Sequence, residues 1–107
     1  MRRAKFGNKK TMRNGMMFDS KKEADRWDQL KLLERVGRIR NLERQVKYEL
    51  RVNGVLIATY KADAVYEETT PMGWVPVVED SKGYPNDRWP MKKKLMRAVH
   101  GITVRET

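Results

Sequence analysis

Cysteine is absent from this 107-residue chain, and histidine occurs only once. The first absence excludes disulfides and thiolate–zinc sites. The second excludes a nuclease site built on two histidines, so His100 is interpreted as structural. No hydrophobic run approaches the roughly 20 residues of a membrane span, and Arg2-Arg3 is not followed by the apolar run of a secretion signal. We therefore expect a cytoplasmic protein with no membrane contact and no small-molecule cofactor.

Acidic residues are scarce relative to basic ones. The chain has 24 Lys and Arg against 14 Asp and Glu, which gives a formal net charge of +10. Such an excess favours a polyanionic partner, above all nucleic acid, because each neutralised phosphate releases condensed counterions. The alternative is a protein that is merely basic.

Acids are missing altogether from the first 18 residues, MRRAKFGNKKTMRNGMMF. Gly and Asn interrupt any periodicity there, so residues 1–17 are expected to form a flexible basic arm and residues 18–107 a single folded domain. The arm is either a disordered tail or a segment that follows a phosphate backbone. In the second case its contacts come from Arg2, Arg3, Lys5, Lys9, Lys10 and Arg13.

Local signals beyond the arm predict helices and strands. Ser20 and Glu23 form a capping box at the start of a helix, and from Gln45 the apolar period changes to two. Asn53-Gly54 is typical of a tight β-hairpin because both positions accept positive φ. Pro76 either precedes the third strand or lies where its ladder is open. The predicted elements are a helix over 20–36, strands over 45–52, 55–66 and 74–82, a helix over 90–99 and a strand over 102–105.

The segment VVEDSKG, residues 77–83, ends the third predicted strand with charged side chains. Asp80 and Lys82 are two residues apart, so both point to the same side of a strand. They form either a solvated ion pair or half of a metal-dependent site that cuts phosphodiester bonds.

The turn before this strand predicts a partner for Asp80. A turn centred between Pro71 and Met72 pairs residues whose numbers sum to 143, and Asp63 and Asp80 satisfy that sum. Their carboxylates would then face each other about 5 Å apart at Cβ. A slip of one residue would present Glu79 in place of Asp80.

Two carboxylates at that separation share a proton or bind a cation. Oxygen ligands suit Mg²⁺, which keeps several waters and accepts phosphate oxygens. Lys82 would then lie close to a scissile phosphate and to the attacking water. The residues by themselves do not decide between the solvated ion pair and the metal site.

Together these residues resemble the PD-(D/E)xK nuclease superfamily, whose core runs αβββαβ. Its signature is an Asp on the second strand and Asp or Glu-x-Lys on the third, which correspond here to Asp63 and Asp80-Ser81-Lys82. Ala62 stands where many members have proline. More closely, the chain is similar to small phage and prophage proteins related to Holliday-junction resolvases. The matching segments are FGNKKT, FDSKKEADRWDQLKLLERVGRIRNLERQ, residues 60–66, VVEDSKG and KKKL with its following Gly-Ile.

The resemblance implies a mixed α/β (α+β) fold of the restriction-endonuclease type, with a mixed sheet flanked by helices. It also implies a hydrolytic site. Asp63, Asp80 and the main-chain carbonyl of Ser81 would hold Mg²⁺, with Mn²⁺ as a substitute, and Lys82 would position the attacking water.

Two further residues correspond to positions near that site. Glu23 would approach the metal from the first helix, although its capping box alone would account for it. Gln45 is the other candidate, and its alternative is an ordinary amide at the start of a strand. We carry both as candidate catalytic residues.

Basic and aromatic side chains elsewhere are candidates for substrate contact. The second helix has a basic surface that either is solvated or grips the phosphate backbone. Trp74 and Trp89 either pack within the fold or stack on bases. The basic residues of this helix are Lys92, Lys93, Lys94 and Arg97.

The expected function is a Mg²⁺-dependent phage DNA endonuclease in the bacterial host cell, acting on branched or otherwise structured DNA. The resemblance to resolvases implies a homodimer. Two alternatives are a non-catalytic DNA-binding module of the same fold and a structural or DNA-packaging-associated protein of a phage particle.

Overall fold

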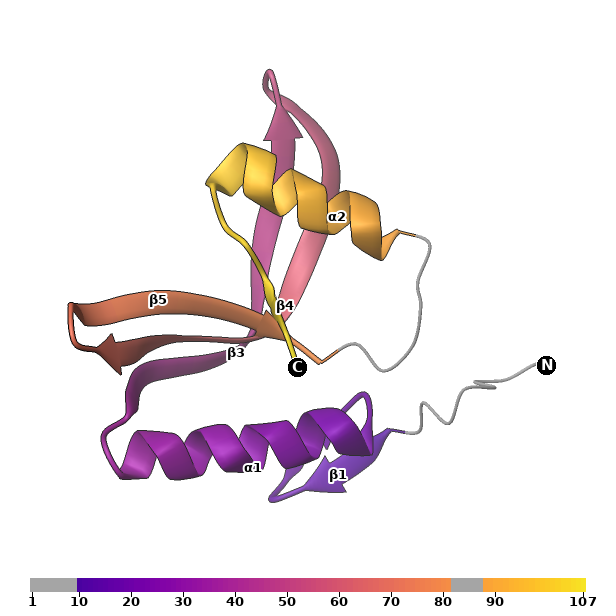
Figure 1. Ribbon diagram of the computed structural model, residues 1–107. Helices are drawn as coiled ribbons and strands as arrows, with labels where there is room; N and C mark the ends of the chain where they lie inside the picture. Colours follow the sequence, from indigo (N-terminus) through magenta and orange to yellow (C-terminus); the bar gives the residue numbers. More distant parts are fainter. Residues whose placement is uncertain (1–9, 82–87) are drawn as a thin grey trace.

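The computed structural model describes residues 10–81 and 88–107 (Figure 1). After a small N-terminal hairpin the elements follow the order αβββαβ, and the predicted mixed α+β fold is confirmed. None of the helices in these ranges is long and apolar enough to cross a membrane. The elements are β1 (Thr11–Arg13), β2 (Met16–Phe18), α1 (Lys21–Arg35), β3 (Ile39–Val52), β4 (Val55–Thr70), β5 (Gly73–Asp80), α2 (Trp89–Leu95), the π-helical turn η1 (Met96–His100) and β6 (Arg105–Glu106).

The main sheet has four strands in the order β3-β4-β5-β6. Neighbours are antiparallel except β5 and β6, which are parallel and are joined through α2. The strands β3 and β4 form a long hairpin that extends well beyond β5 (Figure 1). Helix α1 lies beside the half of the sheet that contains β5, and α2 lies along the extended half (Figure 1).

The fold has two apolar cores. The core beneath α2 and η1 contains Leu50, Tyr60, Ala62, Val78, Met96 and Val104. The core beneath α1 contains Leu30, Ile39, Ala64, Tyr66 and Val77. Together they bury the aliphatic and aromatic surface that stabilises a domain of this size.

Strand β4 contributes to both cores, although regular alternation would keep its even-numbered residues on one face. Tyr60 and Ala62 belong to the α2 core, whereas Ala64 and Tyr66 belong to the α1 core. The strand therefore changes face at Asp63. Opposite it in β3 lies Gln45, which has a positive φ of 57°. The residue pairs before and after Gln45 have the same register.

Several local predictions are confirmed. Helix α1 begins at Lys21, and Ser20 Oγ accepts a hydrogen bond from Glu23 N at 3.1 Å. Asn53 and Gly54 both adopt positive φ in the β3–β4 turn. Pro76 lies within β5 and pairs with Glu67 of β4. It has no partner in β6, because β6 pairs with the last two residues of β5.

Other predictions are wrong in their bounds. The irregular arm predicted over 1–17 is replaced, in its described part, by the β1–β2 hairpin, whose turn is another Asn-Gly pair with positive φ at both residues. Strand β3 begins at Ile39 rather than at Gln45, so Gln45 lies inside the strand. Strand β4 continues to Thr70, and β6 is Arg105–Glu106 rather than 102–105.

Leu50→Ala tests the α2 core. Leu50 is fully buried, so its truncation leaves a cavity and should lower the free energy of unfolding by about 2–5 kcal/mol. Ile57→Ala in the same hairpin is the matched control, because Ile57 is 50% exposed and should cost less than about 1 kcal/mol. Urea denaturation measures both, and equal losses would contradict this description of the core.

Candidate functional site

The register between β4 and β5 is the one predicted from the turn. Ala64 pairs with Glu79 and Val65 with Val78, so the partners' numbers sum to 143. The pairs end at Ala64 and Glu79, so Asp63 and Asp80 are the next residues along the two strands, at the end of β5. Glu79 and Asp80 therefore point to opposite faces of the sheet.

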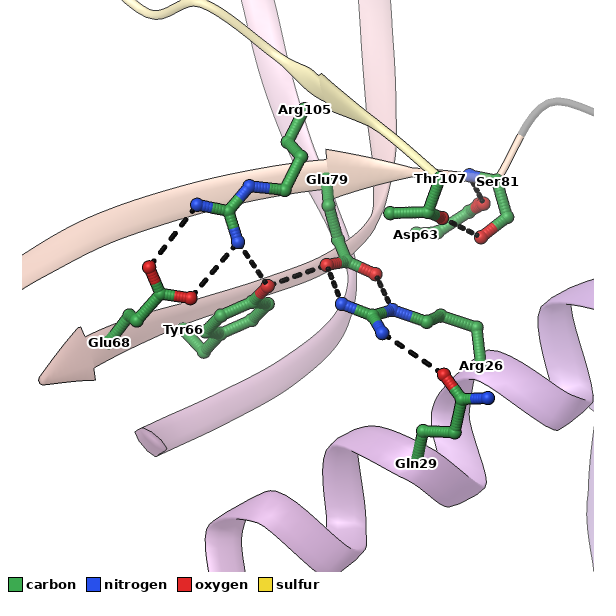
Figure 2. A network of polar contacts seen from close by, with 9 residues as sticks. All are labelled: Arg26, Gln29, Asp63, Tyr66, Glu68, Glu79, Ser81, Arg105 and Thr107. Atoms are coloured by element: carbon green, nitrogen blue, oxygen red, sulfur yellow. Dashed lines mark hydrogen bonds and ion pairs between the residues drawn. The ribbon is translucent and has the colours of Figure 1, made fainter. Parts of the chain in front are cut away.

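Asp63 lies where β4 changes face, and its carboxylate meets the end of β5. Its Oδ2 accepts a hydrogen bond from Ser81 N at 2.8 Å (Figure 2). The hydroxyls of Ser81 and Thr107 are 2.7 Å apart, and Thr107 N donates to the Asp80 carbonyl oxygen at 3.0 Å. These bonds hold the segment that leads to Lys82, which itself lies outside the described residues.

Asp80 is fully buried on the α2 side of the sheet, where Val78 also packs. The Tyr60 hydroxyl donates a hydrogen bond to Asp80 Oδ2. Burial, this hydrogen bond and the charges of Asp80 and Asp63 raise the pKa of Tyr60 far above its usual value. Tyr60 therefore remains a hydrogen-bond donor, with its ring 5.3 Å from that of Trp89 and 6.4 Å from that of Tyr48.

Glu23 caps α1 and also faces the site. Its Oε1 accepts from Asp19 N at 3.3 Å, and its Oε2 accepts from Gln45 Nε2 at 2.9 Å. The side chain is buried, and this burial, followed by the charge of Asp63, raises the pKa of Glu23 above its usual value. The capping interpretation of Glu23 is therefore confirmed, its approach to a metal stays a prediction, and Gln45 is the residue that orients its carboxylate.

Glu79 is committed to a structural role by three hydrogen bonds. Arg26 donates to its two oxygens at 2.8 and 3.0 Å, and the Tyr66 hydroxyl donates at 2.6 Å (Figure 2). Burial and the bond to Glu79 raise the pKa of Tyr66 to about 12. Arg105 extends this network to Glu68 at 3.0 Å. With this register and these partners, Glu79 is not the ligand that a slipped register would have presented.

Four residues of this arrangement were missed by sequence reasoning: Arg26, Tyr60, Tyr66 and Arg44, whose Nη2 lies 3.8 Å from Glu23 Oε2. The two tyrosines were interpreted only as apolar strand residues. A buried tyrosine hydroxyl needs a hydrogen-bond partner, and that requirement was the available signal. Nothing in the local sequence distinguishes Arg26 and Arg44 from solvated arginines.

Two of the N-terminal basic residues that were predicted to contact substrate lie close to acidic side chains of the protein itself. Lys10 Nζ is 3.3 Å from Asp19, and Arg13 Nη1 is 2.7 and 2.8 Å from Asp25 and Asp28 of α1. Arg13 therefore attaches the β1–β2 hairpin to the helix. Arg2, Arg3, Lys5 and Lys9 lie outside the described residues.

The basic surface predicted on the second helix is present on α2 and η1. Lys93 pairs with Glu106, and Arg97 Nη1 donates to Thr103 Oγ1 at 3.3 Å. Lys94 is exposed, and Lys92 is half-buried.

The single histidine and two tryptophans make contacts within the fold. His100 Nε2 lies 2.8 Å from the Glu49 carbonyl oxygen and so links η1 to β3. The Arg40 guanidinium lies 4.2 Å above the Trp74 ring, and Trp89 Nε1 donates to Glu106 at 3.2 Å.

A polar pocket of about 320 Å³ opens in front of Asp63. Its walls combine acidic or amide groups with cations and two aromatic rings. The lining residues are Asp19, Gln45, Tyr60, Lys61, Asp63, Arg88, Trp89 and Lys92. Such a pocket offers cations to an anionic group while carboxylates lie beside it.

The donor set suits a hard cation that retains water. Among residues 10–81 and 88–107, no three Asp, Glu, His or Cys side chains converge closely enough to hold a metal ion. Mg²⁺ needs only one or two carboxylates beside water and phosphate oxygens. Asp63 and the Ser81 carbonyl could supply oxygen donors at this strand end, and Asp80 could join them once its carboxylate turns away from Tyr60. The repulsion between Asp63 and Glu23 is a cost that a divalent ion would relieve.

A family model described as "Protein of unknown function (DUF1064)" matches residues 3–105, which is nearly the whole chain. No curated protein and no solved structure matches the chain significantly.

Glu23→Gln should show a pH-dependent gain in stability. The folded protein raises the pKa of Glu23 above the ordinary 4.5, so folding favours the protonated form and wild-type stability falls as pH rises through that raised pKa. The amide never ionises, so the difference in unfolding free energy between variant and wild type should shift in favour of the variant between about pH 4 and about pH 7. Urea denaturation at both pH values measures the change.

Glu49→Gln is the matched control, because Glu49 is exposed on β3. Its difference from wild type should change less over the same range, because the ion pair that Glu49 forms with Arg51 is exposed to solvent and contributes little to stability. A Glu23→Gln difference that is equally independent of pH would contradict the raised pKa of Glu23 in the folded protein.

Proposed function

The chain belongs to the DUF1064 family, and we propose that it is a Mg²⁺-dependent endonuclease that hydrolyses phosphodiester bonds of DNA. The observation that carries the proposal is the β4–β5 register, whose last pair, Ala64 and Glu79, directly precedes Asp63 and Asp80 at the end of β5. The αβββαβ order, the Asp80-Ser81-Lys82 sequence and the +10 charge support it. They agree with the resemblance to PD-(D/E)xK nucleases.

Each residue of the site has a proposed role. Asp63, Asp80 and the Ser81 carbonyl would hold Mg²⁺, with Mn²⁺ as a substitute. When bound, the ion supplies Lewis-acid stabilisation of the charge that develops on the phosphate. Lys82 orients the attacking water and holds or receives its proton at Nζ.

The residues around these groups position them. Tyr60 donates to Asp80 and so restricts the orientation of its carboxylate. Gln45 does the same for Glu23, whose carboxylate adds negative charge beside Asp63. The bond from Gln45 keeps Glu23 in place before a metal binds, whereas the bond from Tyr60 holds the Asp80 carboxylate in a buried orientation that it would leave to reach the ion.

The proposed substrate is branched or otherwise structured DNA, and the proposed active form is a homodimer in the cytoplasm of a bacterial cell. Both follow from the resemblance to phage proteins related to Holliday-junction resolvases. A dimer would supply one site for each of two strands.

A second candidate is a DNA-binding module of the same fold without turnover. One observation favours it: Asp80 is fully buried, with its carboxylate turned to Tyr60. A carboxylate held in this way reaches a metal only if its side chain rotates.

Cleavage assays with a four-way junction, a flap and a linear duplex separate the two candidates. Wild-type protein should cut at least one of them in Mg²⁺ or Mn²⁺ and none in EDTA. Asp80→Asn and Lys82→Ala should each lower the rate by at least about a hundredfold, with DNA affinity largely retained, because these residues act on the reacting groups. Glu49→Gln, on the exposed face of β3, should cut like wild type. If wild type cuts none of these substrates in either metal, the binding-module function holds.

Metal binding can be measured without DNA. Mn²⁺ should bind wild-type protein in titration calorimetry, and Asp63→Asn should weaken that affinity by at least about tenfold, because a charged ligand is lost. Asp25→Asn is the control, since Asp25 lies on α1 and pairs with Arg13 and Lys21. Equal affinity for wild type and Asp63→Asn would remove Asp63 from the metal site.

A further inference from the structure

Two lysines lie directly opposite each other in the β3–β4 ladder, beside the candidate site. Lys47 pairs with Lys61, and both side chains are exposed. Like charges at directly opposed positions destabilise a sheet. Within residues 10–81 and 88–107, neither lysine forms an ion pair or a hydrogen bond through its side chain. The hairpin therefore retains an unfavourable pair of charges.

This arrangement contrasts with other basic side chains of the fold. Arg13, Arg26, Lys93 and Arg105 each pair with a carboxylate. Those cations hold elements together. The lysine pair holds nothing together, so its charge is available to a ligand.

The position of the pair relates it to Asp63. Lys61 precedes Asp63 by two residues in β4 and lines the same pocket. Lys92 of α2 lines that pocket from another element and, like the pair, forms no ion pair with a residue of the described ranges. Lys61 and Lys92 thus line the opening in front of Asp63, and Lys47 lies directly opposite Lys61 in the adjacent strand.

We infer that Lys47, Lys61 and Lys92 bind the phosphate backbone of the DNA strand that enters this pocket. Phosphate oxygens between the two opposed lysines replace their mutual repulsion with two attractive contacts. The repulsion that destabilises the unbound sheet is therefore relieved when DNA binds. This inference rests on the proposed function in one respect, because that function places the cleaved bond at Asp63. Binding itself is measurable without cleavage.

The test is the double variant Lys47→Ala/Lys61→Ala. DNA affinity is measured by fluorescence anisotropy with a labelled four-way junction and a duplex of related sequence, in EDTA and over a series of salt concentrations. The variant should bind about tenfold more weakly, and the slope of log affinity against log salt should fall in magnitude by about 2. Its resistance to urea should equal or exceed that of wild type, because the repulsion is gone, and this excludes misfolding as the cause.

Lys31→Ala/Arg35→Ala on α1 is the matched control, because it removes the same charge from exposed positions of another element. Its affinity and salt slope should stay close to wild type. The inference is overturned if the lysine-pair variant binds like wild type, or if the control loses as much affinity.

The two proposals fail in different ways. If wild type binds DNA through the lysine pair but never cuts it, the endonuclease proposal fails and the phosphate contacts stand. If wild type cuts DNA and the lysine-pair variant binds as tightly as wild type, the endonuclease proposal stands and the phosphate contacts fail.

Discussion

The buried carboxylate of Glu79 is the constraint on which the candidate site depends. Only 1% of Glu79 is exposed, and a buried charge is strongly destabilising unless it is paired and hydrogen-bonded. Arg26 of α1 and Tyr66 of β4 satisfy it together, which requires α1 to dock on this face and β5 to keep this register. Because adjacent strand residues point to opposite faces, the same contacts direct Asp80 to the other face. There the Tyr60 hydroxyl donates a hydrogen bond to its carboxylate.

The site lies where the sheet departs from regular alternation. Gln45 adopts positive φ in β3, and β4 changes face at Asp63 directly opposite. This irregularity lets one strand contribute to both cores and leaves Asp63 between them, within reach of the end of β5 and of the charge of Glu23. Such departures from regular strand geometry are concentrated at functional positions because they aim side chains that a regular ladder could not.

Charge is used in two ways in this molecule. Away from the pocket, arginines pair with carboxylates and attach the N-terminal hairpin to α1, and α1 and β6 to the sheet. Beside the pocket, Glu23 and Asp63 are held close to each other, and among the described residues the Lys47–Lys61 pair has no acidic partner. Like charges that lie close together lower the free energy of unfolding. Proteins commonly carry such a cost where they bind a charged ligand.

The sequence by itself determined the features that depend on neighbours along the chain. The capping box begins α1, Asn53-Gly54 forms the hairpin turn, and the position of the second turn sets the register of β4 and β5 as far as Ala64 and Glu79. The N-terminal Asn14-Gly15 turn carried the same signal, but the basic residues around it led to a prediction of an arm. Only the tertiary structure decided where β4 changes face and which partners the buried polar groups have. Arg26 and Glu79 are 53 residues apart, and their pairing follows from how α1 packs on the sheet, a long-range choice that no periodicity or turn signal encodes.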